Sequence, residues 1–160
     1  MVDNTQLTYL INRDPILKFK YRGCFARDTF PILKHNEFVI VNTDPSSQAG
    51  EHWLLIASKN DTVLLYDSFG RDFSQFFGDI YKKVQAWSKL SHQKVFQYMP
   101  TSTLLQPFDS QFCGIFCLFI AYFYYKTKKS LTDKKTIQIS SFPAYATEED
   151  ILRFGAAMLT

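Results

Sequence analysis

The pair Cys113-Gly114 separates a polar loop from a wholly apolar stretch, Ile115 to Tyr125. This order predicts a thiol at the first turn of a buried helix. Unpaired backbone N–H groups and the positive end of the helix dipole favour thiolate over thiol there. Polar residues before Cys113 keep the position accessible, and the missing side chain of Gly114 would let a substrate backbone approach. Cys113 is therefore a candidate nucleophile.

An imidazole and a carboxylate that could serve this thiol lie upstream, in the order His, Asp, Cys. A glycine-containing loop precedes His52 and an apolar stretch follows it, so it is either a base or a half-buried, satisfied histidine. Asp67 ends an apolar stretch before Ser-Phe-Gly, so it either forms a turn or reaches a side chain of another strand. The residue types alone leave both alternatives open for each.

The other cysteines and histidines are not candidates for catalytic residues. Cys24 and Cys117 are expected to be inert core thiols, because cysteine is among the most often buried residues. His35 and His92 stand in polar stretches and are expected at the surface. Without a C-x-x-C pair we expect no metal site, and no phosphate-binding glycine motif or Gly-x-Ser-x-Gly is present.

Short apolar stretches predict the strands that would position these residues. A hairpin turn is expected at Ser58 to Asp61. The expected strands are 38–41, 52–57, 62–66 and 95–98.

Three further stretches predict helices. Leu7, Leu10 and Ile11 share one face of a short helix that Asp14-Pro15 would end. Apolar residues from Phe73 to Leu90 recur at intervals of three and four, which predicts one amphipathic helix through Gly78. A capping box at 147–150 predicts a C-terminal helix.

The composition is that of one globular domain spanning residues 1–160, with 46% hydrophobic residues and a net charge of +3. Three cysteines indicate a reducing, intracellular compartment. We expect no secretory signal near Met1, and Cys113 to Tyr125 falls short of the roughly 20 residues that a membrane span needs. A monomer without membrane contact is expected.

Several motifs occur in the order, and nearly the spacing, of a known peptidase family. The chain resembles the adenovirus-type maturation proteases (adenain-like), within the wider group of Ulp1-like cysteine peptidases. The matching motifs are Gly23-Cys24-Phe25, Phe30-Pro31, Val41-Asn42-Thr43, His52-Trp53, Asp67-Ser68-Phe69-Gly70, and Gln106 followed seven residues later by Cys113-Gly114.

The resemblance implies a role for each site residue. His52 would be the base, Asp67 the orienting acid where adenovirus enzymes carry Glu, and Cys113 the nucleophile. Gln106 would donate to the oxyanion together with the Cys113 N–H. Gln111 competes with Gln106 by residue type, but the spacing favours Gln106. Trp53 would either pack beside the imidazole at the substrate side or act as a core aromatic.

The resemblance also implies an α+β, papain-like fold in which a central mixed sheet is flanked by helices. The expected function is a viral cysteine endopeptidase that cleaves capsid or core precursor polypeptides, in the virion and in the host nucleus or cytoplasm. DNA or a viral peptide would activate it, the peptide without a disulfide because no cysteine lies between Cys24 and Cys113. The candidate DNA contacts are Lys126, Lys128, Lys129, Lys134 and Lys135, or the region from Lys18 to Arg27.

Two alternatives stay open. A deubiquitinating or deSUMOylating isopeptidase of the same fold would use the same residues. Those enzymes usually carry Asp before the nucleophile and Gln six residues ahead, whereas Phe112 and a spacing of seven favour the viral branch. The second alternative is a DNA-binding or scaffold protein with a decayed site, which the intact set of His, Asp, Gln and Cys disfavours.

Overall fold

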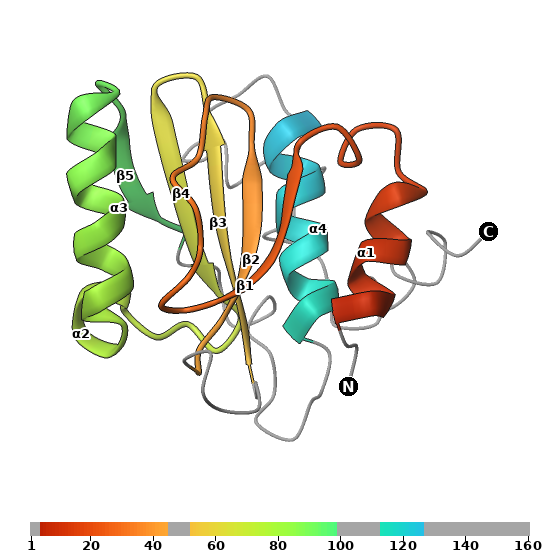
Figure 1. Cartoon of the computed structure of the whole chain (residues 1–160), viewed down its shortest axis with the longest axis horizontal. Helices are drawn as coiled ribbons and strands as arrows, with labels where there is room; N and C mark the ends of the chain where they lie inside the picture. The colour runs from red at the N-terminus through yellow and green to blue at the C-terminus, as the bar shows by residue number, and fades with distance from the viewer. Residues whose placement is uncertain (1–3, 45–51, 99–112, 127–160) are drawn as a thin grey trace, which may run out of the picture.

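The computed structural model describes residues 4–44, 52–98 and 113–126. They form a five-stranded sheet with the strand order β1-β2-β3-β4-β5 and helices on both faces (Figure 1). The predicted helix after residue 147, Gln106 and Gln111, and the basic residues from Lys128 onward lie outside the described residues.

The sheet is mixed, as the α+β prediction requires. Its central strands β2, β3 and β4 form antiparallel pairs, whereas β1 joins β2 and β5 joins β4 in parallel. Each predicted strand is present with shifts of one or two residues at its ends. The strands are β1 (Tyr21–Ala26), β2 (Phe38–Asn42), β3 (Trp53–Lys59), β4 (Thr62–Asp67) and β5 (Lys94–Gln97).

The predicted hairpin connects β3 to β4 through Asn60 and Asp61. Asn60 has a φ of 52°, a left-handed conformation that asparagine adopts more readily than most residues. The tight connection makes β3 and β4 run side by side, so the start of β3 lies next to the end of β4.

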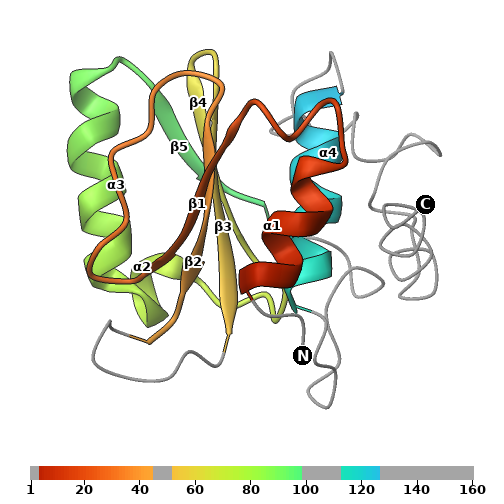
Figure 2. The same cartoon turned by 45° about the vertical axis from the view of Figure 1, so that its right-hand side comes forward.

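The central strands are buried along almost their whole length because both faces of the sheet are covered. In β2, Phe38 and Ile40 face the layer of α1 (Asn4–Asn12) and α4 (Cys113–Lys126). Val39 and Val41 face the opposite layer, which contains α2 (Phe73–Phe76) and α3 (Gly78–Leu90). Figure 2 shows the sheet between these two helical layers.

The single helix expected from Phe73 to Leu90 is wrong, since the structure has two helices. The break falls at Phe77, whose backbone leaves the helical region with φ −133° and ψ 52°. Phe77 is buried with the apolar face of α3, and the glycine after it has a low helix propensity. Asp72 caps α2 by accepting a hydrogen bond from the Gln75 N–H at 3.1 Å.

Strand β1 was not predicted from the sequence. Its residues are half-buried or exposed, so they lack the continuous apolar pattern of the central strands. The pairing with β2 is irregular between Tyr21 and Cys24, where Gly23 has a φ of 129°. An edge strand with a glycine bulge carries little periodic signal.

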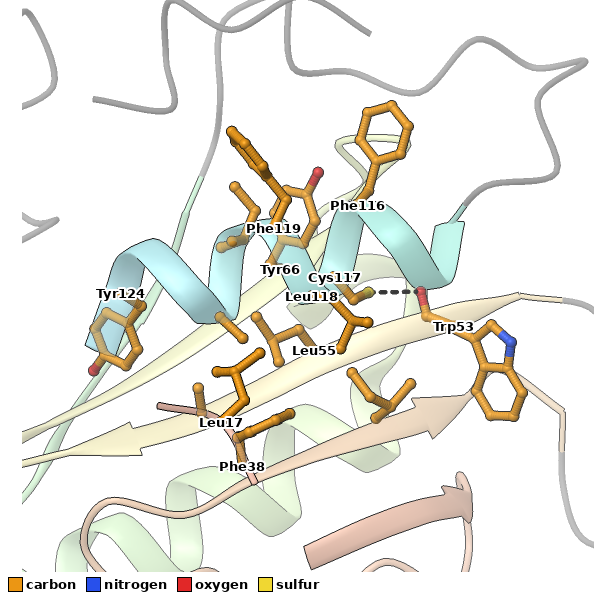
Figure 3. Packing of buried hydrophobic residues seen from close by; sticks show 14 of the residues in the cluster. Leu17, Phe38, Trp53, Leu55, Tyr66, Phe116, Cys117, Leu118, Phe119 and Tyr124 are labelled. Carbon is orange, nitrogen blue, oxygen red and sulfur yellow. Dashed lines mark hydrogen bonds between the residues drawn. The ribbon is translucent and has the colours of Figure 1, made fainter. Parts of the chain in front are cut away.

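Helix α4 confirms the prediction of a buried apolar helix that begins at Cys113. Its buried side chains pack on β3 and on Leu17 and Phe38, as Figure 3 shows. No helix within the described residues is both long and apolar enough to cross a membrane.

Candidate active site

His52 and Asp67 meet at one end of the sheet. His52 immediately precedes β3 and Asp67 is the last residue of β4, and the antiparallel register pairs Leu54 with Asp67. The His52 Nε2 atom lies 2.6 Å from Asp67 Oδ1. The histidine is 7% exposed and the aspartate fully buried. For Asp67, the sequence left open a turn or a contact with another strand. The structure shows the contact, because the Asp67 carboxylate reaches the side chain of His52, which immediately precedes β3.

Each of the two carboxylate oxygens of Asp67 accepts two hydrogen bonds. Oδ1 accepts from His52 Nε2 and from the Phe69 N–H at 3.2 Å. Oδ2 accepts from the Arg71 N–H at 3.1 Å and from Arg71 Nε at 2.8 Å. Asp67 thus forms its turn and orients the histidine as well.

Burial by itself would raise the pKa of Asp67, because it penalises the charged form. The hydrogen bonds from His52 and Arg71, and the charges of these two groups, outweigh burial and lower the pKa below its ordinary range. The carboxylate is therefore ionised at neutral pH and can only accept hydrogen bonds. Consequently the Nε2 atom of His52 carries the proton, which leaves Nδ1 as the basic nitrogen of the neutral ring.

Phe69 stacks on the imidazole of His52, with ring centroids 4.5 Å apart and planes at 16°. The sequence motif contained Phe69, but no role was predicted for it. Trp53, the aromatic residue expected beside the imidazole or in the core, is 9% exposed and belongs to the core cluster on the α4 side. Contact between Trp53 and a substrate remains a prediction.

The N-terminal half of α4 is attached to the strand that follows His52. The buried Cys117 thiol donates to the Trp53 carbonyl oxygen over 3.5 Å (Figure 3). At the far end, Lys59 Nζ donates to the Tyr124 carbonyl oxygen at 2.7 Å. The helix therefore runs along β3 in the same direction, and its N-terminus lies at the His52 end.

Cys113 is the first residue of α4, one turn before Cys117 and on the same helical face. The backbone position predicted for the nucleophile is thus at the end of the sheet that holds His52 and Asp67. The Cys113 side chain and Gln106 are outside what the structure describes. Their chemical roles stay predictions.

Gly114 packs closely against α1. A Cβ atom at this position would lie 2.8 Å from Leu7 Cδ2, which is too close for an undisturbed contact. The structure thus gives the glycine a packing role between α1 and α4. Approach of a substrate backbone to Gly114 is still a prediction.

The other sulfurs have inert surroundings, as expected from the sequence. Cys24 is half-buried and its Sγ lies 2.7 Å from the Tyr21 hydroxyl oxygen. Burial raises the pKa of Cys24 to about 11, although the Tyr21 hydrogen bond opposes this rise. His35 and His92 are exposed, and no group of three potential metal ligands gathers within the described ranges.

Arg71 is a site residue that the sequence analysis missed. It follows Asp67 by four positions, a spacing compatible with a charge pair, but the segment between them is a turn and not a helix. Only the path of that turn shows that the arginine folds back onto Asp67. A charge pattern alone would not have separated Arg71 from other surface arginines.

Comparisons with known proteins give a family, a relative and a shared fold. The family model of the adenovirus endoprotease matches residues 23–144. A relative called Protease, from Bovine adenovirus 7, is 30% identical over 97 residues, covering 57% of this chain and 48% of the relative. The chain thus spans about half the length of this curated relative. The crystal structure of a protease from ASFV superposes with a TM-score of 0.58 at 15% identity, covering 99% of this chain and 67% of that one, and shows a shared fold.

Proposed function

The chain belongs to the adenovirus endoprotease family, and on this premise we propose that it is a viral cysteine endopeptidase. Its substrates are capsid or core precursor polypeptides that are cleaved during virion maturation. It works as a monomer, in the reducing compartment of the host cell and in the virion. Turnover requires neither a metal nor an organic cofactor.

One observation carries the proposal. A buried His52–Asp67 pair, with 2.6 Å between Nε2 and Oδ1, lies at the end of the sheet where α4 begins with Cys113. A histidine oriented by a carboxylate can act as a base, and a helix N-terminus stabilises a thiolate. Few structural roles require these three residue types at one end of a sheet.

In the proposed mechanism, His52 takes the Cys113 proton at Nδ1 while Asp67 holds Nε2–H. The thiolate attacks the scissile carbonyl carbon, and Gln106 with the Cys113 N–H donates to the resulting oxyanion. When the tetrahedral intermediate collapses, the C–N bond breaks and the imidazolium gives its proton to the departing amine. Water, deprotonated by His52, then hydrolyses the thioester and regenerates Cys113.

The test combines labelling with cleavage. Wild-type protein should react at Cys113 with an electrophile directed to cysteine-protease sites, and should cut candidate capsid or core precursors at defined positions. The Cys113→Ala variant should do neither. Release of ubiquitin or SUMO from isopeptide conjugates, without cleavage of viral precursors, would favour the isopeptidase alternative. If the wild-type protein shows no labelling and no cleavage, the result would favour the DNA-binding or scaffold alternative.

We further propose that DNA or a non-covalently bound viral peptide raises the activity. In the region from Lys18 to Arg27, Arg22 pairs with Glu37 at 3.2 Å and Arg27 pairs with Asp79. Their charges are largely neutralised, so the DNA contacts assigned to this region are Lys18 and Lys20. Such binding should weaken steeply with salt because it depends on counterion release.

Turnover with and without DNA or viral peptides, across salt and under reducing and oxidising conditions, tests this regulation. Activation confined to oxidising conditions, with a mixed disulfide on Cys24, would contradict a non-covalent peptide. Salt-independent activation by DNA would contradict the electrostatic contacts.

A further inference from the structure

Arg71 binds the oxygen of Asp67 that His52 does not use. Its Nε and its backbone N–H both donate to Oδ2, at 2.8 and 3.1 Å, whereas His52 lies on Oδ1. Two donors on Oδ2 restrict rotation about the bond that carries the carboxylate. A guanidinium is suited to this because it is planar and permanently charged.

Two aromatic rings hold the guanidinium in place. Its Cζ atom lies 5.2 Å from the ring centroid of Phe69 and 5.1 Å from that of Phe77. Phe69 also stacks on His52, and Phe77 is the buried residue between α2 and α3. In the part of the chain that the structure describes, Asp67 is the carboxylate paired with Arg71, and Arg71 Nη2 is buried without a hydrogen-bond partner. The guanidinium is thus committed to Asp67.

Contacts of the backbone, with itself and with the Gln97 side chain, hold the turn independently of the Arg71 guanidinium. The Gly70 N–H donates to the Asp67 carbonyl oxygen at 2.8 Å. On β5, the Gln97 amide donates to the Arg71 carbonyl oxygen at 2.6 Å and accepts from the Phe73 N–H at 2.8 Å. The guanidinium is therefore not needed to close the turn, and its effect falls on the charge and orientation of Asp67.

Building on the proposed peptidase function, we propose that Arg71 is a positioning residue that keeps the Asp67 carboxylate ionised and its Oδ1 directed at His52. Asp67 requires such a partner because it is fully buried, and burial favours the neutral form of a carboxyl group. A protonated Asp67 carries a proton on one oxygen and accepts less strongly on the other. His52 would then lose its orientation toward Cys113.

The charged and titratable groups around Asp67 come from few elements. Within the described residues they are His52 before β3 and Arg71 in the turn after β4. The N-terminus of α4, with Cys113, lies at the same end of the sheet and stabilises negative charge on the sulfur. Removal of the Arg71 charge makes this region more negative, which disfavours both the Asp67 carboxylate and the Cys113 thiolate.

The experiment compares the pH profile of kcat/KM in wild type, Arg71→Met and Arg71→Lys. Methionine removes the charge and keeps an unbranched side chain that can contact both rings. The acidic limb of Arg71→Met should move to higher pH by about 1 to 3 units, the size of effect that one nearby opposite charge has on a carboxyl group. Lysine should restore most of the wild-type profile. Arg22→Met is the matched control, because it removes an arginine from a carboxylate pair with Glu37 on the β1 side of the sheet.

Two results would overturn the proposal. One is a uniform loss of kcat/KM in Arg71→Met with an unmoved acidic limb, which indicates a purely structural role. The other is an equal shift in Arg22→Met. Should Arg71→Met not fold, Arg71→Gln removes the same charge. Failure of both to fold while Arg71→Lys folds would mean that the charge serves folding, and would also overturn the proposal.

A second readout keeps this inference separate from the peptidase function. The Asp67 side-chain carboxyl carbon, followed by NMR, should titrate at higher pH in Arg71→Met than in wild type. If wild type cleaves no precursor but this titration shifts, the proposed function fails and the Arg71 contact with Asp67 stands. An unchanged Asp67 titration in an active enzyme would refute the role of Arg71 alone.

Discussion

The Cys117 thiol donates to the Trp53 carbonyl oxygen over 3.5 Å, which joins the N-terminal half of α4 to the residue after His52. A buried, otherwise inert cysteine thus helps to place the helix that starts with the candidate nucleophile. The two cysteines one turn apart have separate tasks. Cys117 holds the helix against β3, and Cys113 is proposed to perform the chemistry.

The first prediction separates the three cysteines. Cys113→Ala should give a folded protein without turnover, since Cys24 lies in a strand and Cys117 lies inside α4. Cys24→Ala should keep most activity because burial holds that thiol protonated. Cys117→Ala should lower the free energy of unfolding by about 1 kcal/mol while leaving turnover measurable. Thermal unfolding and kcat/KM report the two effects, and an active Cys113→Ala protein would remove the nucleophile assignment.

The second prediction ranks His52 above Asp67. Loss of the base in His52→Ala should lower kcat/KM by about 10² to 10⁴-fold. Asp67→Ala should cost less, because the helix N-terminus still favours the thiolate and Phe69 still stacks on the ring. Asp72→Ala is the control, since Asp72 is an exposed cap of α2. Inactivation by Asp72→Ala or Asp61→Ala, with Asp67→Ala active, would exclude Asp67 from the site.

The third prediction concerns stability and pH. The folded-state pKa of Asp67 is below its ordinary value of 3.8, so the carboxylate stabilises the fold at pH values above 3.8. This contribution is lost as the pH falls from there through the lower folded-state pKa. Urea unfolding of wild type and Asp67→Asn should therefore give a difference in unfolding free energy that is largest near neutral pH and shrinks in acid. A difference independent of pH would contradict the lowered pKa.

The fourth prediction tests the oxyanion donor, a residue outside the described part of the chain. Gln106→Ala should lower kcat by about 10² to 10³-fold, the usual cost of losing one such donor. The melting temperature should change little, because the proposed hydrogen bond forms with the reaction intermediate. Gln111→Ala is the matched comparison. A larger loss in Gln111→Ala would show that the seven-residue spacing points to the wrong glutamine.

The sequence predicted the parts of this site that follow from strand and helix ends. Asp67 ends a strand and His52 precedes one, and the short hairpin between them brings these ends together. The start of α4 at Cys113 follows from the abrupt change from polar to apolar residues. The local pattern and the family resemblance were sufficient for these three residues because the sequence changes between polar and apolar at each of them.

Other features depend on tertiary contacts and left no local signal. Arg71 contacts Asp67 through the path of a turn that Gln97 on β5 holds in place. The break at Phe77 appears only in its backbone conformation, because the side chain is apolar and buried as the helical periodicity already predicted. Strand β1 lies at the sheet edge, so its side chains lack the buried pattern by which the central strands were predicted.

The last prediction distinguishes packing from substrate contact at Gly114. Gly114→Ala adds a Cβ atom 2.8 Å from Leu7 Cδ2, and this overpacking should destabilise the fold by about 1 to 3 kcal/mol. Leu7→Ala creates a cavity at the same contact, so the double variant should be more stable than the sum of the two single effects implies. Urea unfolding of the four proteins measures this coupling. If Gly114 acts through packing, kcat/KM of the folded fraction should stay close to wild type in the double variant. Additive stabilities would contradict the packing role of Gly114. A loss of kcat/KM that Leu7→Ala does not relieve would support the predicted approach of substrate backbone to Gly114.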